Sequence, residues 1–276
     1  MKKMQLRWSK TLLRSVIIVG VLICFGCSVL NSEKDKPAPF SSKNATVKRT
    51  IDVDKAVAAR VMAGSAYLES GDFERAHRHL DRALELDPNS SQAHGAIALL
   101  YRFEGDVENE EKHYSEALKL DPKNSSVRHN YGSFLCGVGR FDEAAEAFRQ
   151  VVADYRYERR GQSYENLGRC LLKQDKTLEA EKAFGHAYRL NKNLPRTVLA
   201  LAVIYYDLGR NQDSHRLLRH FETIAQTTPE SLWLGIRLER IFGDLDALAS
   251  YEIALKNMYP GSNEYAMYNR SSDHLQ

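Results

Sequence analysis

Small, aromatic and capping residues recur along this chain with a period of 34 residues. In residues 57–90 the recurring positions are Ala63-Gly64, Tyr67, Gly71, Phe73, Ala76, Leu80, Ala83-Leu84 and Pro88. One period later these positions hold Ile97-Ala98, Tyr101, Gly105, Tyr114, Ala117-Leu118 and Pro122. Each copy predicts two helices, because Gly71 can accept a left-handed C-cap, Asp72 can cap the next helix, and Pro88 stops that helix.

This pattern resembles the tetratricopeptide repeat (TPR), a helical hairpin of 34 residues. Gly64 and Ala76 lie where the two predicted helices cross, and only small side chains let the two backbones approach closely. Tyr67 and Leu80 fill the space between the helices. One hairpin cannot bury both of its faces, whereas stacked copies can. The resemblance therefore implies an array of stacked hairpins.

Six copies span residues 57–90, 91–124, 125–158, 161–194, 195–228 and 229–262, with Arg159-Arg160 inserted before the fourth. Asp175 replaces the turn glycine in the fourth copy, and Trp233 lies one position late in the sixth, which predicts an irregular first helix there. We therefore predict an all-α fold, a right-handed TPR superhelix (solenoid) of twelve main helices over residues 55–262. Residues 263–276 are predicted to be a polar, frayed tail.

Residues 1–26 resemble a bacterial lipoprotein signal peptide. Five basic residues and no acidic residue precede a short apolar run over residues 15–25, which is too short to span a bilayer comfortably. Gly26-Cys27 matches the end of a lipobox, although Cys24 stands where leucine is usual. We expect Cys27 to be lipidated and residues 27–54 to be a flexible tether. An uncleaved anchor and ordinary cleavage are the alternatives.

The resemblance also implies a destination. Ser28 follows the predicted lipidated cysteine, where an aspartate would resemble an inner-membrane retention signal. Its absence implies an outer-membrane, lipid-anchored and periplasm-facing location. The partner at this end of the chain would then be the membrane itself, reached through the N-terminal lipid.

Bulk charge and motif content favour neither nucleic-acid binding nor catalysis. The net charge of +3 becomes −2 without residues 1–26, because 34 of the 39 basic residues remain against 36 acidic ones. We find no phosphate-binding loop, no nucleophile elbow and no zinc-protease motif. The sequence therefore predicts a non-enzyme that needs no cofactor, metal or small-molecule substrate.

Cys136 and Cys170 are 34 residues apart on the first helices of neighbouring repeats. A disulfide between repeats is possible in an oxidising compartment. A disulfide needs Cα atoms about 4.4–6.8 Å apart, whereas neighbouring helix axes lie about 8–10 Å apart. Two buried thiols are therefore the preferred prediction.

In TPR arrays the first helices line a concave groove, and this resemblance assigns certain motif positions to it. Here those positions hold Leu99, Arg102, Phe103, His129, Ser133, Cys136, Gln162, Glu165, Arg169, Lys173, Arg196, Leu199, Val203, Tyr206, Asp207, Trp233 and Arg237. Asn130 and Asn166 occupy a position at which peptide-binding TPR proteins often hold a peptide backbone, although hydrogen bonding along the helix is an equal alternative. The partner-binding candidates are Arg102, Phe103, Asn130, Asn166, Arg169, Tyr206 and Trp233, because aromatic and arginine side chains dominate binding energies.

The order of lipobox, polar tether and six repeats resembles the PilF/PilW family, the outer-membrane lipoproteins of type IV pilus biogenesis that serve as secretin pilotins. The last repeat also resembles that family, through the run from Leu232 to Leu238, Phe242-Gly243-Asp244 and Tyr259-Pro260. Membership would imply binding of secretin subunits as protein partners and help with their localisation and multimerisation. The alternative is an envelope scaffold that docks cell-wall hydrolases or other periplasmic proteins.

Overall fold

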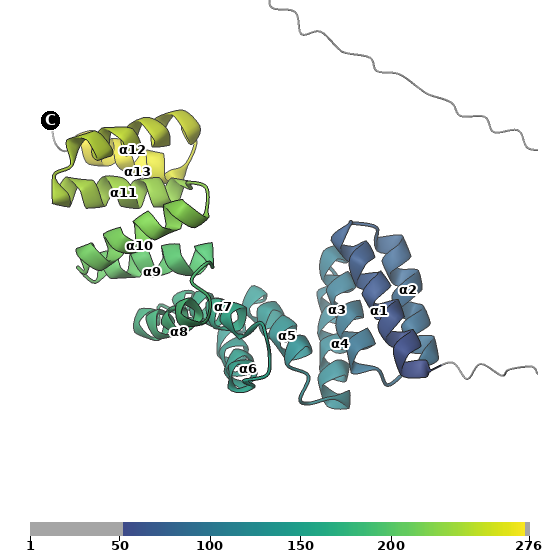
Figure 1. The fold of residues 1–276 in the computed structure, drawn as a ribbon. Helices are drawn as coiled ribbons and strands as arrows, with labels where there is room; N and C mark the ends of the chain where they lie inside the picture. The colour runs from purple at the N-terminus through teal and green to yellow at the C-terminus, as the bar shows by residue number, and fades with distance from the viewer. Residues whose placement is uncertain (1–51, 274–276) are drawn as a thin grey trace, which may run out of the picture. The chain divides into compact units, whose positions relative to one another are not determined.

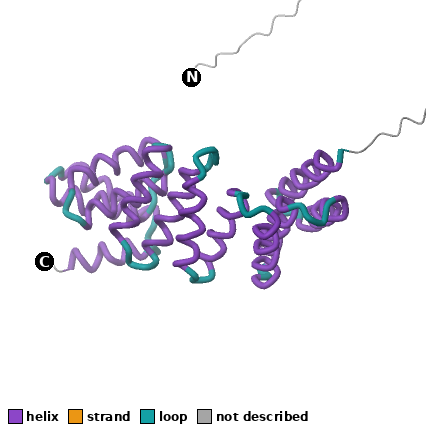
Figure 2. The backbone as a smooth tube through the Cα atoms, turned by 90° about the horizontal axis from the view of Figure 1, so that it is seen from below, coloured by secondary structure: helices purple, strands orange, loops and turns teal. Residues whose placement is uncertain are grey.

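The computed structural model describes residues 52–273, which form thirteen α-helices. They are α1 (Val53–Glu69), α2 (Phe73–Leu86), α3 (Ser91–Glu104), α4 (Val107–Leu120), α5 (Ser125–Gly137), α6 (Phe141–Ala153), α7 (Arg160–Leu172), α8 (Thr177–Leu190), α9 (Pro195–Asp207), α10 (Asn211–Ile224), α11 (Pro229–Phe242), α12 (Leu245–Met258) and α13 (Asn263–Asp273). No strand occurs within residues 52–273, and short loops join the helices (Figure 2). The predicted all-α fold is confirmed.

No helix between Val53 and Asp273 is both long and apolar enough to cross a membrane. The predicted signal peptide and most of the tether lie outside the described residues.

Helices α1 to α12 form six successive hairpins, each packed on the next (Figure 1). The predicted start and stop signals act as expected in the first hairpin. The side chain of Asp72 accepts a hydrogen bond from the backbone N–H of Arg75 at 3.0 Å, and Gly71 has a positive φ of 76°. Local sequence therefore sets the turn between α1 and α2.

Close approach of the two helices in a hairpin requires a small residue at their crossing point, and in the first and sixth hairpins that residue is glycine. A Cβ added to Gly64 would lie 2.6 Å from the side chain of Leu80, and one added to Gly235 would lie 2.8 Å from the ring of Tyr251. Both pairs are sixteen residues apart, so the sixth hairpin packs as the first does. The prediction of an irregular first helix in that repeat is wrong. The structure has α11 as an uninterrupted helix of 14 residues, because its crossing glycine is displaced by one position together with its partner.

The prediction of a frayed tail over residues 263–276 is also wrong for most of that segment, because Asn263–Asp273 forms α13. This helix packs against α11, and its Tyr265 and Tyr268 contact the main core. Arg240 of α11 donates a hydrogen bond to the hydroxyl of Ser271 at 3.1 Å. The apolar faces of Tyr265 and Tyr268 thus give a mostly polar segment enough contact to order it.

Three clusters of buried residues stabilise the array. A large cluster of buried residues runs from α3 to α12 and includes Tyr114, Phe148 and Phe184, all fully buried. Two smaller clusters join the first two repeats, one around Leu80 and Leu100 and one of three residues from α1, α2 and α3. The first hairpin is therefore held mainly by its own neighbour, and the later hairpins share one continuous core.

Candidate functional site

Arg102 of α3 ties three helices together. Its guanidinium donates to Glu110 of α4 at 2.7 Å and to the backbone carbonyl of Asn130 of α5 at 3.1 Å, and it lies 5.7 Å from the ring centre of Tyr114. Glu110 is only 4% exposed, and this burial raises its pKa above the ordinary value, although Arg102 opposes the rise. The structure therefore brings the candidates Arg102 and Asn130 together in a contact between repeats.

Asn166 of α7 belongs to a polar network with α5. Its amide group donates to the hydroxyl of Ser133 at 3.2 Å and lies 3.5 Å from Nε2 of His129. Nδ1 of His129 is hydrogen-bonded to the Ser163 hydroxyl at 2.7 Å. Because that hydroxyl donates to the carbonyl of Arg159 at 3.3 Å, it accepts from Nδ1. In this arrangement His129 is neutral, because burial and nearby Arg159 and Arg102 lower its pKa to about 4.

This network overturns two groove expectations. His129 and Glu165, assigned to the groove lining from the sequence, are buried, and Glu165 accepts a hydrogen bond from Thr197 of α9 at 2.7 Å. Both side chains point between neighbouring first helices. They connect repeats to each other and offer no contact surface to a partner.

Cys136 and Cys170 form a disulfide between α5 and α7, so the preferred prediction of two free thiols is wrong. Their Cα atoms lie 5.9 Å apart, within the range that a disulfide needs. The argument from helix axes failed because each Cα lies about 2.3 Å from its own axis. Residues that face each other are therefore closer than their axes.

The remaining aromatic candidates are partly engaged. The guanidinium of Arg237 lies 4.3 Å from the ring centre of Tyr206 and 5.5 Å from that of Trp233, so these two candidates form one stack between α9 and α11. Phe103 is 56% exposed and stacks on Phe73 of the first hairpin, with ring centres 5.7 Å apart. Of the aromatic candidates, Phe103 therefore offers the most surface to a partner.

Arg169 lies at the edge of a pocket of about 540 Å³, which we call the groove pocket. Its apolar lining is Leu172, Phe184, Pro195, Leu199, Ala200, Phe221, Ala225 and Pro229. Its charged lining is Arg169, Arg196, Glu230 and Glu264. Three of these residues, Arg169, Arg196 and Leu199, come from the positions that the sequence assigned to the concave groove. Arg169 also borders a smaller cavity of about 160 Å³ with Asn166, Lys173 and the disulfide.

The groove pocket contains charges that the sequence-based candidates left out. Glu230 stands at the second position of its repeat, the position that puts Arg196 in the groove, so the motif register could have identified it. Its pKa is raised because surrounding atoms desolvate its carboxylate and Glu264 lies nearby, while Arg237 opposes the rise. Glu264 could not be identified in this way, because it belongs to α13, and the sequence predicted a frayed tail for this segment.

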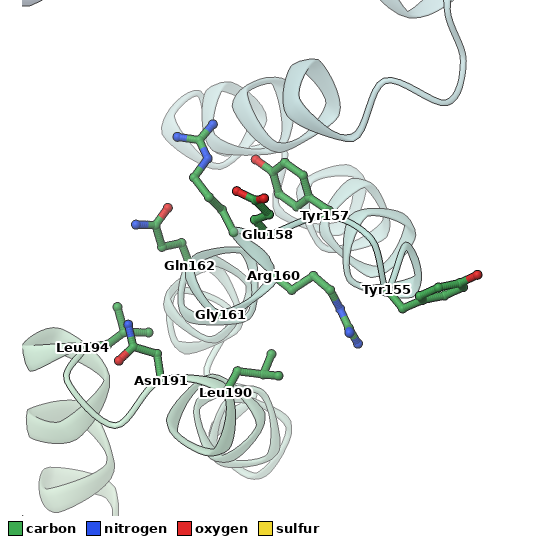
Figure 3. A pocket seen from close by; sticks show the side chains of 10 residues that line it. Tyr155, Tyr157, Glu158, Arg160, Gly161, Gln162, Leu190, Asn191 and Leu194 are labelled. Atoms are coloured by element: carbon green, nitrogen blue, oxygen red, sulfur yellow. The ribbon is translucent and has the colours of Figure 1, made fainter.

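A second pocket, of about 300 Å³, lies beside the two-residue insertion (Figure 3). Its arginines are already engaged, because Arg160 donates to the carbonyl of Val152 at 3.0 Å and Arg159 donates to Ser126 at 3.4 Å. Tyr155 is 79% exposed and points away from the pocket (Figure 3). This pocket is therefore a consequence of the longer loop between α6 and α7.

No group of three or more histidine, cysteine, aspartate or glutamate side chains that could hold a metal ion occurs in the part of the chain that the structure describes. The charges of the groove pocket stand on separate helices around an apolar floor. This arrangement suits recognition of a larger molecule, because apolar contact supplies binding energy and the charges supply orientation.

Comparison with known proteins agrees with this geometry. Two models of the tetratricopeptide repeat family match residues 61–125 and 124–193. The type IV pilus assembly protein PilF of Pseudomonas aeruginosa is 36% identical over 215 residues, which cover 77% of this chain and 84% of PilF. These matches confirm the TPR superhelix. Repeats of this kind build extended concave surfaces for protein partners.

Solved structures give the same picture. A structure from the functional characterisation of Pseudomonas aeruginosa PilF is 35% identical, with a TM-score of 0.77, and the match covers 79% of this chain and 99% of that one. PilW, described as a widely conserved type IV pilus biogenesis factor, matches with a TM-score of 0.66 over 77% of this chain and 97% of its own. At 23% identity the likeness to PilW shows the fold alone.

Proposed function

Because this chain belongs to the PilF family of type IV pilus assembly proteins, we propose that it is an outer-membrane lipoprotein that acts as a pilotin. In this role it binds secretin subunits and promotes their localisation and multimerisation for type IV pilus biogenesis. The identity to PilF over most of both chains is the observation that carries the proposal.

The structure supports a binding role through its groove. The groove pocket has an apolar floor with charges at its edge, and the exposed ring of Phe103 stacks on Phe73 across the first two hairpins. Stacked hairpins present such surfaces on successive repeats, so a partner segment can bind along them without a change of fold. Binding alone is sufficient for a pilotin, since it delivers and aligns its partner without chemistry.

The lipid anchor completes the proposal. The basic start, the short apolar run and Gly26-Cys27 support attachment of diacylglycerol at Cys27. Cys27→Ser should then release the protein from membranes or leave its precursor unprocessed, while Ser28→Ala should be anchored normally. Intact-mass measurement of the purified wild-type protein checks this directly, and an unmodified Cys27 would contradict it.

The pilotin role is tested in cells that lack this protein. We expect heat-stable secretin multimers to disappear from the outer-membrane fraction, and to return when the wild-type gene is supplied. Arg102 is a poor site for a loss-of-binding variant, because its removal would leave Glu110 buried without its partner. Phe103→Ala is more informative, because this exposed ring can be removed with little effect on folding. Unchanged secretin multimers in the deletion strain would refute the pilotin role.

A further inference from the structure

The groove pocket has an apolar floor large enough for more than one side chain. Its volume of about 540 Å³ falls in the range of pockets that hold ligands. Phe221 and Leu199 are themselves almost fully buried, so the floor is held firmly by the core. Helices α7, α9 and α11 supply most of the lining, and Glu264 adds the start of α13.

Within residues 52–273, the side chains of the two arginines of the pocket have no partner. Among the described residues, neither Arg169 nor Arg196 forms a hydrogen bond, an ion pair or a ring contact, and both side chains are exposed. Many arginines elsewhere in the array are engaged, as Arg102 is with Glu110 and Arg210 is with Glu181. Two free guanidinium groups beside one apolar pocket can therefore give bidentate hydrogen bonds to carboxylates of a ligand.

Two carboxylates stand on the other helices around the pocket. Glu230 is the second residue of α11 and Glu264 the second residue of α13, and within the described part of the chain neither forms a salt bridge. They repel each other, and the pocket walls partly desolvate Glu230. A cationic group placed between them would relieve this repulsion. The pocket thus separates its charges, with cations on α7 and α9 and anions on α11 and α13.

We infer that the groove pocket binds a protein segment in one fixed direction, with apolar side chains on its floor, an acidic residue at Arg169 and Arg196, and a basic residue at Glu230 and Glu264. This inference rests on the proposed function, because it takes the segment to belong to the protein that this chain helps to assemble. A lipid or fatty acid would satisfy the floor and the arginines and leave both carboxylates unpaired. Only a ligand that carries both charges satisfies all four groups.

The test is selection of peptides from a random twelve-residue library displayed on phage, with the full-length protein in detergent as the target. On the wild type we expect enriched peptides to share an apolar pair with an acidic residue on one side and a basic residue on the other. On Arg169→Glu/Arg196→Glu the acidic preference should be replaced by a second basic one. Peptides selected on the wild type should bind this variant at least about tenfold more weakly.

A matched control is Lys182→Glu/Arg189→Glu, which changes the net charge equally at two exposed positions of α8 outside the pocket. It should bind the selected peptides as the wild type does. If the selected peptides carry no charge preference, or bind Arg169→Glu/Arg196→Glu unchanged, the inference is wrong. Enrichment of apolar peptides that detergent or fatty acid displaces equally from both proteins would also overturn it, in favour of a lipid site.

The same double variant in cells separates this inference from the proposed function. Changed peptide selection with normal secretin multimers would leave the pocket assignment in place and contradict its role in pilotin function. Lost multimers with unchanged peptide selection would support the pilotin role and contradict the pocket assignment.

Discussion

Two junctions between neighbouring repeats are held together by different interactions. One lies between α3 and α5, and the other lies between α5 and α7. At the first, Arg102 connects a buried carboxylate and a backbone carbonyl. At the second, a disulfide and a neutral histidine network connect the helices, without a buried charge pair. The 34-residue motif is shared by both junctions, so it does not determine what holds one repeat to the next.

The difference has energetic consequences. Removing one partner from a buried ion pair is costly, yet the pair as a whole adds little net stability, because desolvation offsets the attraction. A disulfide instead restricts the unfolded chain. We therefore expect the second junction to be the more stable one, and to respond to reductant and to acid in ways that the first does not.

The largest expected effect comes from the disulfide. It links residues 34 apart, and closing a loop of this length stabilises a fold by about 3–4 kcal/mol in the chain-entropy model. Cys136→Ala/Cys170→Ala, or reduction of the wild type, should lower the free energy of unfolding by that amount in urea titrations. The double variant serves as the control for reductant, which should not affect it. An equal midpoint for oxidised and reduced wild type would contradict the expectation.

Acid should weaken the same junction through His129. The unfolded histidine binds a proton below about pH 6.5, whereas the folded one does so only near its pKa of about 4. The unfolded state therefore holds more protons between these values, and stability falls as the pH falls through that window. The loss should reach about 3 kcal/mol at the acid end, measured by urea titration at several pH values.

His129→Asn is the control for this pH dependence. Its amide can still donate to Ser163 but cannot titrate, so the variant should be less stable at pH 7 and should lose less stability between pH 6.5 and 4. Identical slopes for wild type and variant would show that other groups, such as the N-capping aspartates, account for the acid sensitivity.

A smaller loss of stability is expected from substitutions at the points where the two helices of a hairpin cross. The second hairpin has Ala98 at the position where the third has Gly132, and a Cβ on Gly132 would lie 3.1 Å from the Phe148 ring. Gly132→Leu should therefore destabilise the protein by about 1–3 kcal/mol through overpacking. Gly132→Ala should cost clearly less, because a small shift of the ring accommodates one methyl group. An unchanged unfolding midpoint for Gly132→Leu would contradict this account of the crossing.

These features mark what sequence alone could predict. The hairpins, their turns and their crossing points follow from small residues, caps and prolines close together in the chain, and Gly64 with Leu80 is one such pair. The contacts that Arg102, His129 and Cys136 make with the following repeat join residues about one repeat apart, and their geometry depends on how the hairpins stack. The groove pocket was predictable only through its motif positions, and the contribution of Glu264 required α13.

The smallest effect concerns the turn between α7 and α8. The turns of the other five hairpins contain Gly71, Gly105, Gly139, Gly209 and Gly243, each with positive φ, whereas Asp175 takes this conformation with φ of 58°.

The backbone of this turn is otherwise ordinary, since the backbone N–H of Lys176 donates to the carbonyl of Leu171 at 3.0 Å, as the backbone N–H of Asp106 does to the carbonyl of Tyr101 at 2.9 Å. A left-handed residue with a Cβ costs about 1–2 kcal/mol, and glycine loses about 0.5–1 kcal/mol more entropy on folding. Asp175→Gly should therefore raise the free energy of unfolding by up to about 1 kcal/mol, and Gly139→Asp should lower it by a similar amount. Thermal unfolding of both variants measures these changes in stability. If Asp175→Gly is less stable than the wild type, the aspartate side chain stabilises the turn by more than its backbone strain costs.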